Sequence, residues 1–447
     1  MDSVHKFDLP WWSRPGLLFA IGSILAALAA YLTPDRSYVL YWRSVKYMTF
    51  GSLLLVLGSV ASFLVGAIAA DALVVSERSP VDWRAAMPWR LTRALFQLSF
   101  WLCMVGYSVW AYVGVSRGLR LQHLIAVIHG EKGVIEYLKR IYLLPVTGIT
   151  TLTQLGIVTM IVGAALGAGT GWRGVWKKLA IVLAVSGLRA LFFSERLALI
   201  ELVVCFVISL VGLKYREWKP SLRNVARLAP ILAPALLIFF FTGFEYFRSW
   251  SNFYADRQTS LVEFGTTRLL GYYATAMDNG AYLMKTLDPP VGVPYFTLNF
   301  LWRFPGIKTT VNQLSGDLSF AYGDPYMGLL QAGANPEFNN ASGVMLPFLD
   351  YGVPGGFVYW VLAGAIVQMF FRLFARREFV GLCMYPLTFM SVLEMPRILY
   401  WADGRAFLPF FLLAGASAAY IYLQRQYGRP RSAWVVGGSG RSWPASY

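Results

Sequence analysis

Apolar residues occur along this chain in long runs that are separated by short polar segments. We predict ten membrane-spanning helices from these runs, because each is close to the ~20 residues that a helix needs to cross a ~30 Å hydrocarbon layer. The predicted spans are 16–33, 47–75, 94–116, 143–168, 178–194, 196–213, 228–247, 354–374, 379–396 and 405–424. This pattern predicts an all-α, polytopic integral membrane protein with about ten transmembrane helices.

The fifth and sixth spans come from a single apolar stretch, 178–213, that contains no proline. As one helix it would be about 54 Å long, which is too long for the bilayer without an extreme tilt. The polar break in this stretch is Ser194–Glu195–Arg196. We therefore expect a tight, outward-facing turn at these three residues.

One long hydrophilic segment, 248–353, separates the seventh span from the eighth. It divides the chain into an N-terminal bundle of about seven helices (1–247), a long extracytoplasmic loop (248–353), a C-terminal three-helix membrane part (354–424) and a tail (425–447). Within the loop we expect amphipathic helices and a re-entrant segment, because a glycine-rich turn follows Asp350 and glycine permits sharp changes of direction.

Basic residues determine the predicted orientation. Lys and Arg are dense in 214–227 and in 372–378, and the positive-inside rule places such loops in the cytoplasm. Both termini are then cytoplasmic, and the long loop faces outward. The basic segment 117–142 disagrees with this scheme, and its pattern is typical of an amphipathic helix on the membrane surface.

Composition excludes several other classes of protein. The chain is 57% hydrophobic and only 14% charged, whereas soluble domains are about 25% charged. We attribute the net charge of +16 to basic loops and to anion handling, and we expect no nucleic-acid partner. The three cysteines lie in apolar runs, the three histidines lack metal-ligand spacing, and no nucleotide-binding motif is present. We therefore expect no metal and no cofactor.

Charged residues near the predicted outer face are the candidates for catalysis. Arg189 and Arg196 flank the expected turn, where free N–H groups at a helix start favour an anion. The alternative is that both arginines reach lipid headgroups, or pair with Glu195 and Glu201. The candidates for a proton acceptor are Glu195, Asp350, Glu394 and Asp403, which the sequence does not rank.

The long loop and the last outer loop supply candidates for substrate binding. Segment 264–285 has helical periodicity, and its tyrosines suit either sugar stacking or an interfacial aromatic belt. Asn339 and Asn340 suit the N-cap of a short helix that follows. Acidic and basic residues in 393–407 either bind substrate or neutralise one another. The candidate binding residues are Arg268, Tyr273, Arg303, Asn340, Arg397, Asp403 and Arg405.

The order of these features resembles the Wzy-type O-antigen and exopolysaccharide polymerases, which join bacterial oligosaccharide repeat units. The features are an S-x-R-x-x-L turn (Ser194, Arg196, Leu199), a long outer loop that opens with a Tyr-rich helix, and an Asn-led segment that ends in D-Y-G-x-x-G-G. The resemblance covers about 180–375. It implies a GT-C-like membrane glycosyltransferase that joins undecaprenyl-diphosphate-linked glycans at the outer face of the bacterial plasma membrane, without nucleotide sugar or metal.

The resemblance also implies roles and partners. Outer-face arginines handle the diphosphate in that family, and they correspond here to Arg196 and also to Arg189 and Arg268. With Glu195 and Asp350 as the acidic candidates, the expected catalytic set is Arg196, Arg189, Glu195 and Asp350. The expected partners are a polyprenyl-diphosphate-linked glycan, membrane lipid and a chain-length regulator protein. The related O-antigen ligases use a histidine in the long loop, and this chain has none there.

Two alternative functions stay open from the sequence. One is a GT-C glycosyltransferase that uses a polyprenyl-phosphate sugar donor, with Asp35 in the first outer loop as the base. The other is a flippase or transporter of lipid-linked oligosaccharides, which usually shows two related halves. We detect no internal repeat in this chain.

Overall fold

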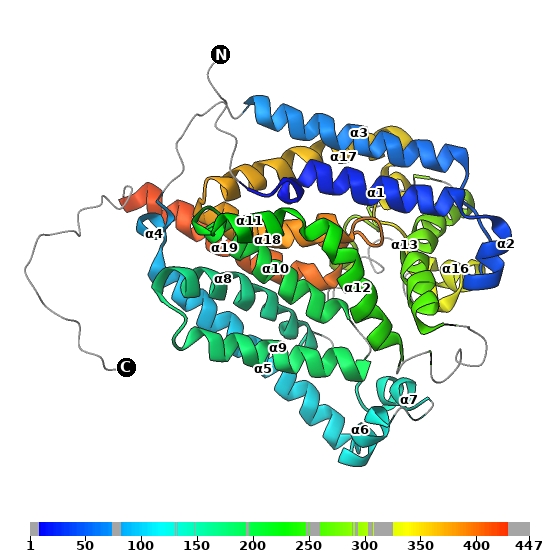
Figure 1. Ribbon diagram of the computed structural model, residues 1–447, viewed down its shortest axis with the longest axis horizontal. Coiled ribbons are helices and arrows are strands. Elements are labelled where there is room, and N and C mark those ends of the chain that lie inside the picture. Colours follow the sequence, from blue (N-terminus) through cyan, green and yellow to red (C-terminus); the bar gives the residue numbers. More distant parts are fainter. Residues whose placement is uncertain are drawn as a thin grey trace, which may run out of the picture.

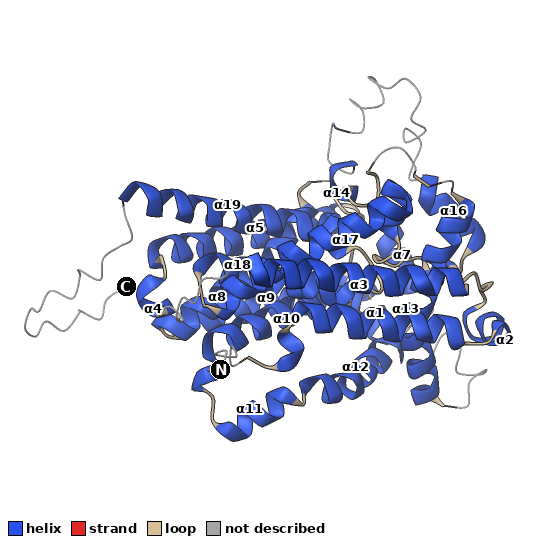
Figure 2. Cartoon of the chain, turned by 90° about the horizontal axis from the view of Figure 1, so that it is seen from above, coloured by secondary structure: helices blue, strands red, loops and turns tan. Residues whose placement is uncertain are grey.

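A computed structural model describes residues 9–427, except 74–81, 130, 132, 147, 194–195, 247–249, 251–259, 288, 291–293, 303–306 and 308–324. The described residues form helices joined by loops and turns, with no strand among them (Figures 1 and 2). The prediction of an all-α protein is confirmed. The predicted tail lies almost wholly outside the described residues.

Seven helices in the described part of the chain are long and apolar enough to cross a membrane. They are α1 (Pro15–Leu32), α3 (Phe50–Leu73), α5 (Trp89–Ser116), α8 (Leu155–Thr170, preceded by η3, Thr150–Gln154), α10 (Leu197–Lys214, followed by η4, Tyr215–Glu217), α17 (Leu346–Ala375) and α19 (Gly404–Tyr427). The bent pair α11 (Pro220–Arg227) and α12 (Ala229–Glu245), with 63° between its helices, would make an eighth span. These lengths and compositions are those of a helical membrane protein.

Two further helices occupy the remaining predicted spans. α9 (Val175–Phe193) contains Lys177, Lys178 and Arg189, so it carries more charged residues than a membrane span usually does. α18 (Phe379–Glu394) is apolar but only 16 residues long. Each of the ten predicted runs therefore contains a helix, while seven or eight of these helices meet the requirements for a span.

Close packing joins helices that are distant in the sequence. α3 and α17 lie side by side in both views of the molecule (Figures 1 and 2). A Cβ added at Gly66 would clash with the carbonyl oxygen of Val361, and one at Gly364 would clash with that of Phe63. Small residues that let two backbones approach are a common basis for helix packing in membranes.

The loops gather at two opposite ends of the bundle (Figure 1). We call one the basic end; it holds α4 (Trp83–Ala86), α11 and the α17–α18 turn. Here Arg84 Nη2 lies 3.1 Å from Glu217 Oε2, and Arg216 Nη2 donates to the carbonyl of Ala375 at 3.2 Å. These contacts bring 214–217 close to the α17–α18 turn, while the cytoplasmic location of both loops stays a prediction.

The opposite end, which we call the cavity end, holds the predicted outer segments (Figures 1 and 2). Its elements include α2 (Asp35–Ser37), α6 (Leu121–Ile128), α7 (Val134–Ile141), α13 (Leu261–Thr286), α14 (Asn299–Trp302), α16 (Pro325–Gly333) and η7 (Pro336–Phe338). The single surface helix predicted in 117–142 is instead two short helices, because Gly133 between them has φ 77°.

The segment that precedes α17 differs in part from its prediction. The expected break after the short helix is present, since Gly352 has φ 69° and ψ 179° inside α17. The prediction that Asn339 or Asn340 caps this helix is wrong, because α17 begins at Leu346. Asn340 instead contributes its carbonyl, which accepts a hydrogen bond of 2.8 Å from Asn279 Nδ2 of α13. α13 is thereby tied to the segment before α17.

Candidate functional site

A cavity of about 540 Å³ lies at the cavity end, between α10, α12, α13, η7 and the loop that connects α18 to α19. Its charged lining residues come from four separate stretches of the chain. They are Lys139, Arg196, Glu337, Glu394, Arg397, Asp403 and Arg405. Four cations and three carboxylates therefore face one space, which makes the cavity suited to an anionic ligand that also carries hydroxyl groups.

Arg196 immediately precedes α10, and the other two residues of the predicted turn, 194 and 195, lie outside the described residues. Its residue is only 8% exposed, and its guanidinium carbon lies 3.7 Å from the ring centroid of Phe241 and 5.4 Å from that of Tyr272. A cation over aromatic faces is favourable in a desolvated site. The guanidinium group thus lies among the aromatic rings of the cavity wall, which disfavours the alternative of a headgroup anchor.

The loop between α18 and α19 contributes an ion pair and a helix cap. Glu394 is buried, and its Oε2 accepts a hydrogen bond of 2.9 Å from Arg397 Nη1. The Nε of Arg397 is buried and has no hydrogen-bond partner within the protein. Asp403 Oδ1 accepts from the backbone N–H of Arg405 at 2.9 Å, at the start of α19. A buried guanidinium N–H without an acceptor is costly, so a bound anion would satisfy it.

α13 supplies the aromatic and ionic wall opposite this loop. Tyr272 and Tyr273 line the cavity together with Asn340. Arg268 is only 5% exposed and does not line the cavity, but its Nη2 lies 2.7 Å from Oε2 of Glu337, which does. Five of the predicted binding residues therefore line this one cavity: Tyr273, Asn340, Arg397, Asp403 and Arg405. Arg268 contacts the cavity wall through its ion pair with Glu337.

Asp350 and Arg189 lie elsewhere, contrary to the expectation that both serve catalysis. The two carboxylate oxygens of Asp350 accept from the backbone N–H of Phe296 at 3.0 Å and of Thr297 at 2.7 Å, and from the hydroxyl of Thr297 at 2.7 Å. This carboxylate fastens the outer segment to α17, so it is poorly placed to act as a base. Arg189 Nη1 donates to Thr153 Oγ1 at 2.9 Å, and the guanidinium lies 5.4 Å from the ring centroid of Trp110.

Other candidates from the sequence fall outside the cavity or outside the described residues. Glu195 and Arg303 belong to the second group. Asp35, the base in the alternative glycosyltransferase mechanism, has a side chain that is 87% exposed, and it lies 3.8 Å from Lys46 Nζ. It does not line the cavity that holds the arginines.

The structure adds residues that the sequence reasoning missed. Lys139 and Glu337 line the cavity, and no local pattern distinguishes them from other polar residues of the outer segments. Glu201 is buried in α10 and accepts a hydrogen bond of 2.6 Å from Tyr400 Oη, which belongs to the α18–α19 loop. A carboxylate inside an apolar run is costly unless it is paired, and this signal marks Glu201 in the sequence.

No known protein family, curated protein or solved structure matches this chain. Among the described residues, no group of three or more His, Cys, Asp and Glu side chains could hold a metal ion. The cysteines at 103, 205 and 383 are free and buried.

Proposed function

We propose that this protein polymerises polyprenyl-diphosphate-linked oligosaccharide repeat units at the outer face of the bacterial plasma membrane. The observation that carries the proposal is the convergence of Arg196, Arg397 and Arg405, with Lys139, on one cavity at a single end of the helix bundle. A diphosphate is the kind of ligand that several guanidinium groups bind well, because each can offer two parallel N–H donors.

In the proposed reaction, a hydroxyl of the acceptor glycan attacks the anomeric carbon of the donor glycan. The new glycosidic bond forms as the bond from that carbon to the diphosphate oxygen breaks, and polyprenyl diphosphate leaves. Negative charge grows on the leaving diphosphate, where Arg196 and Arg397 would stabilise it. Such fixed donors in a site that excludes water are worth more than the same groups in water.

The hydroxyl proton needs an acceptor, and we assign that role to Glu394. Its carboxylate lines the cavity and is buried beside Arg397. The other lining carboxylates have partners that suit structural roles, since Asp403 caps α19 and Glu337 pairs with Arg268. The tyrosines at 272 and 273 offer ring faces on which a sugar could stack.

The conservative variant Arg196→Lys tests this proposal. Alanine would also remove packing, because Arg196 is buried against Phe241, whereas lysine keeps the stem and the charge but loses the planar fork. We expect a loss of about 10²–10³ in transfer rate, the usual effect of removing one transition-state donor. The measurement is the chain-length distribution of the polymer on gels, with the membrane level of the protein checked in parallel.

The matched control is Arg36→Lys. Arg36 is an exposed arginine of α2 at the same end of the molecule, outside the cavity. The control should make polymer of wild-type length. Polymer of wild-type length from Arg196→Lys as well would overturn the diphosphate role of Arg196.

A further inference from the structure

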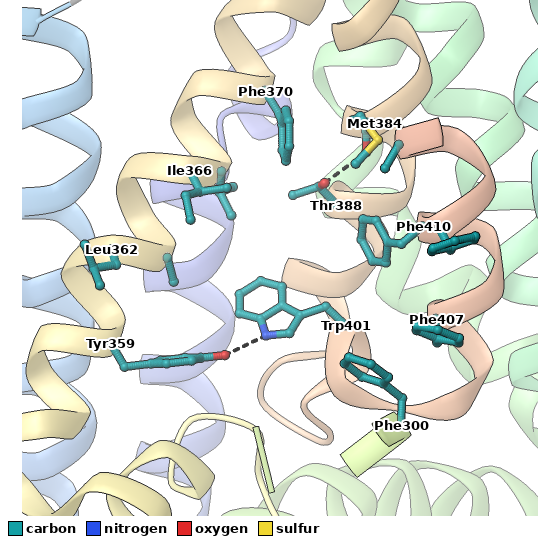
Figure 3. A pocket seen from close by; sticks show the side chains of 14 residues that line it. Phe300, Tyr359, Leu362, Ile366, Phe370, Met384, Thr388, Trp401, Phe407 and Phe410 are labelled. Atoms are coloured by element: carbon teal, nitrogen blue, oxygen red, sulfur yellow. Dashed lines mark hydrogen bonds between the residues drawn. The ribbon is translucent and has the colours of Figure 1, made fainter. Parts of the chain in front are cut away.

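A second concave site lies on the other side of the α18–α19 loop. It is an apolar groove of about 590 Å³, formed by α17, α18 and α19 (Figure 3). α18 packs against both other helices and forms the floor of the groove. Seven aromatic side chains line it, from Phe300, Tyr359, Phe370, Trp401, Phe407, Phe410 and Phe411.

The few polar groups in the groove are satisfied by one another. Trp401 Nε1 donates to Tyr359 Oη at 2.7 Å, and Thr388 Oγ1 donates to the carbonyl of Met384 at 2.9 Å (Figure 3). The remaining lining side chains are hydrocarbon or thioether. A ligand for this groove therefore gains by burying apolar surface and has few polar groups to meet.

The groove adjoins the charged cavity through a short stretch of chain. Trp401 lines the groove, while Asp403 and Arg405 line the cavity. A smaller space of about 130 Å³ shares Asn339, Asn340 and Asp403 with the lining of the cavity, and its lining residue Asn299 precedes Phe300 of the groove. One molecule could thus place an anionic group in the cavity and an apolar chain in the groove.

Aromatic stacking closes the groove where it meets the outer segment. Phe300, which follows Asn299, stacks on Phe407 of α19 with 4.5 Å between ring centroids and 12° between ring planes. α19 therefore presents Arg405 to the cavity and, two residues later, Phe407 to the groove. Arg405 and Phe407 lie in the first turn of α19 and point to opposite sides of it, so an amphiphile with its charge next to its chain would reach both sites past the start of this helix.

We propose that the groove binds the isoprenoid chain of a polyprenyl diphosphate whose diphosphate lies in the cavity. The inference rests on the proposed function for the identity of the lipid. The observations that favour this occupant are the charge complementarity of the cavity, the proximity of the two sites along 401–405, and the satisfied polar groups of the groove. The alternative occupant is the acyl chain of a phospholipid, and the experiment must distinguish it from an isoprenoid chain.

Photolabelling of the purified full-length protein tests the binding site. The probe is a polyprenyl diphosphate without sugar that carries a diazirine on its chain, in vesicles of phosphatidylethanolamine. We expect labelled peptides in 359–370 and 401–414, and we expect added undecaprenyl diphosphate to displace the probe while phosphatidylglycerol does not. Equal displacement by phosphatidylglycerol, or labelling spread over all lipid-facing helices, would overturn the proposal.

A matched pair of variants tests whether filling the groove with a bulky side chain blocks labelling. Ala414→Trp places a bulky ring at an exposed position in the groove, and Ala111→Trp places one at an exposed position of α5 outside it. Labelling should fall about tenfold in the first variant, because the ring occupies the space of the chain, and stay at the wild-type level in the second. Equal labelling of both variants would contradict the site.

The readout separates the two proposals, since the probe carries no sugar to transfer. Specific labelling without polymer formation by the wild-type protein would contradict the polymerase function alone. Polymer formation without specific labelling of 359–414 would contradict the groove alone.

Discussion

Arginines are used differently at the two ends of this molecule. At the basic end, guanidinium groups tie loops to helix ends: Arg216 donates to the carbonyl of Ala375, Arg377 Nε donates to that of Gly212 at 3.2 Å, and Arg84 pairs with Glu217. At the cavity end, Arg196 and Arg397 belong to the wall of a 540 Å³ space. Residue type and density are similar, and the surroundings separate a structural role from a candidate binding role.

The energetic consequences differ between the two ends. Partly exposed ion pairs at the basic end contribute little to stability, since water competes for both partners. Charges that line a cavity are desolvated without gaining full packing, so folding alone gives little reason to keep them together. The cavity end is therefore where we expect substitutions to impair activity more than stability.

The binding role of the cavity end depends on its facing outward, with the basic end in the cytoplasm. We expect a membrane-impermeant maleimide to label Tyr137→Cys in intact cells and to label Leu222→Cys only after permeabilisation. Both positions are exposed, at 47% on α7 and 48% on α11, so access to reagent is the deciding factor. The reverse labelling pattern would place the cavity in the cytoplasm and exclude transfer at the outer face.

Substitution of one glutamate at each end tests whether activity depends on the cavity end more than on the basic end. Glu394→Gln keeps the size of the side chain and an acceptor for Arg397 but removes the proposed base, so we expect the polymerisation rate to fall by about 10²–10⁴. Glu217→Gln at the basic end weakens pairs with Arg84 and Lys214, and should cost at most about 1 kcal/mol of stability with normal polymer. Polymer length and thermal unfolding in detergent measure the two effects.

Asp403→Asn is the internal control for the glutamate experiment. Asparagine is a good N-cap, so the variant should preserve the start of α19 and most of the activity. Loss of polymer in Asp403→Asn with normal polymer in Glu394→Gln would transfer the role of base to Asp403.

The last prediction affects stability alone and concerns a buried carboxylate at the cavity end that serves structure. Asp278 Oδ1 accepts from the backbone N–H groups of Tyr47 and Met48, both at 2.7 Å, and burial raises the pKa of Asp278 to about 6. A raised pKa in the folded state means that stability is highest below the unfolded pKa of 3.8 and is lost as the pH rises through about 6.

Asp278→Asn should remove this dependence, because asparagine keeps the acceptor but never ionises. Between about pH 4 and pH 8, the unfolding free energy of the variant should gain up to about 3 kcal/mol relative to wild type. Thermal unfolding at several pH values measures it, with Asp82→Asn on the exposed α4 turn as the control. Profiles for Asp278→Asn and wild type that run parallel would contradict the prediction.

Local patterns in the sequence were enough to locate the helices and some of the breaks between them. Apolar runs identified the ten helices at the predicted spans, the polar residues 194–196 marked the boundary between α9 and α10, and the glycines after Asp350 marked the break in α17. Basic loops identified the segments that gather at one end. These features depend on hydrophobicity over about 20 residues or on backbone freedom at one residue, and both are encoded locally.

Only the tertiary structure decided which charged residues share a site. Arg196 and Arg397 are 201 positions apart in the chain and line one cavity. The carboxylate of Asp350 instead accepts hydrogen bonds from the backbone amides of 296 and 297. Arg268 looked like a direct ligand and instead holds Glu337. The partner of a long polar side chain depends on how helices pack across the bundle, and hydropathy along a single helix carries no information about that packing.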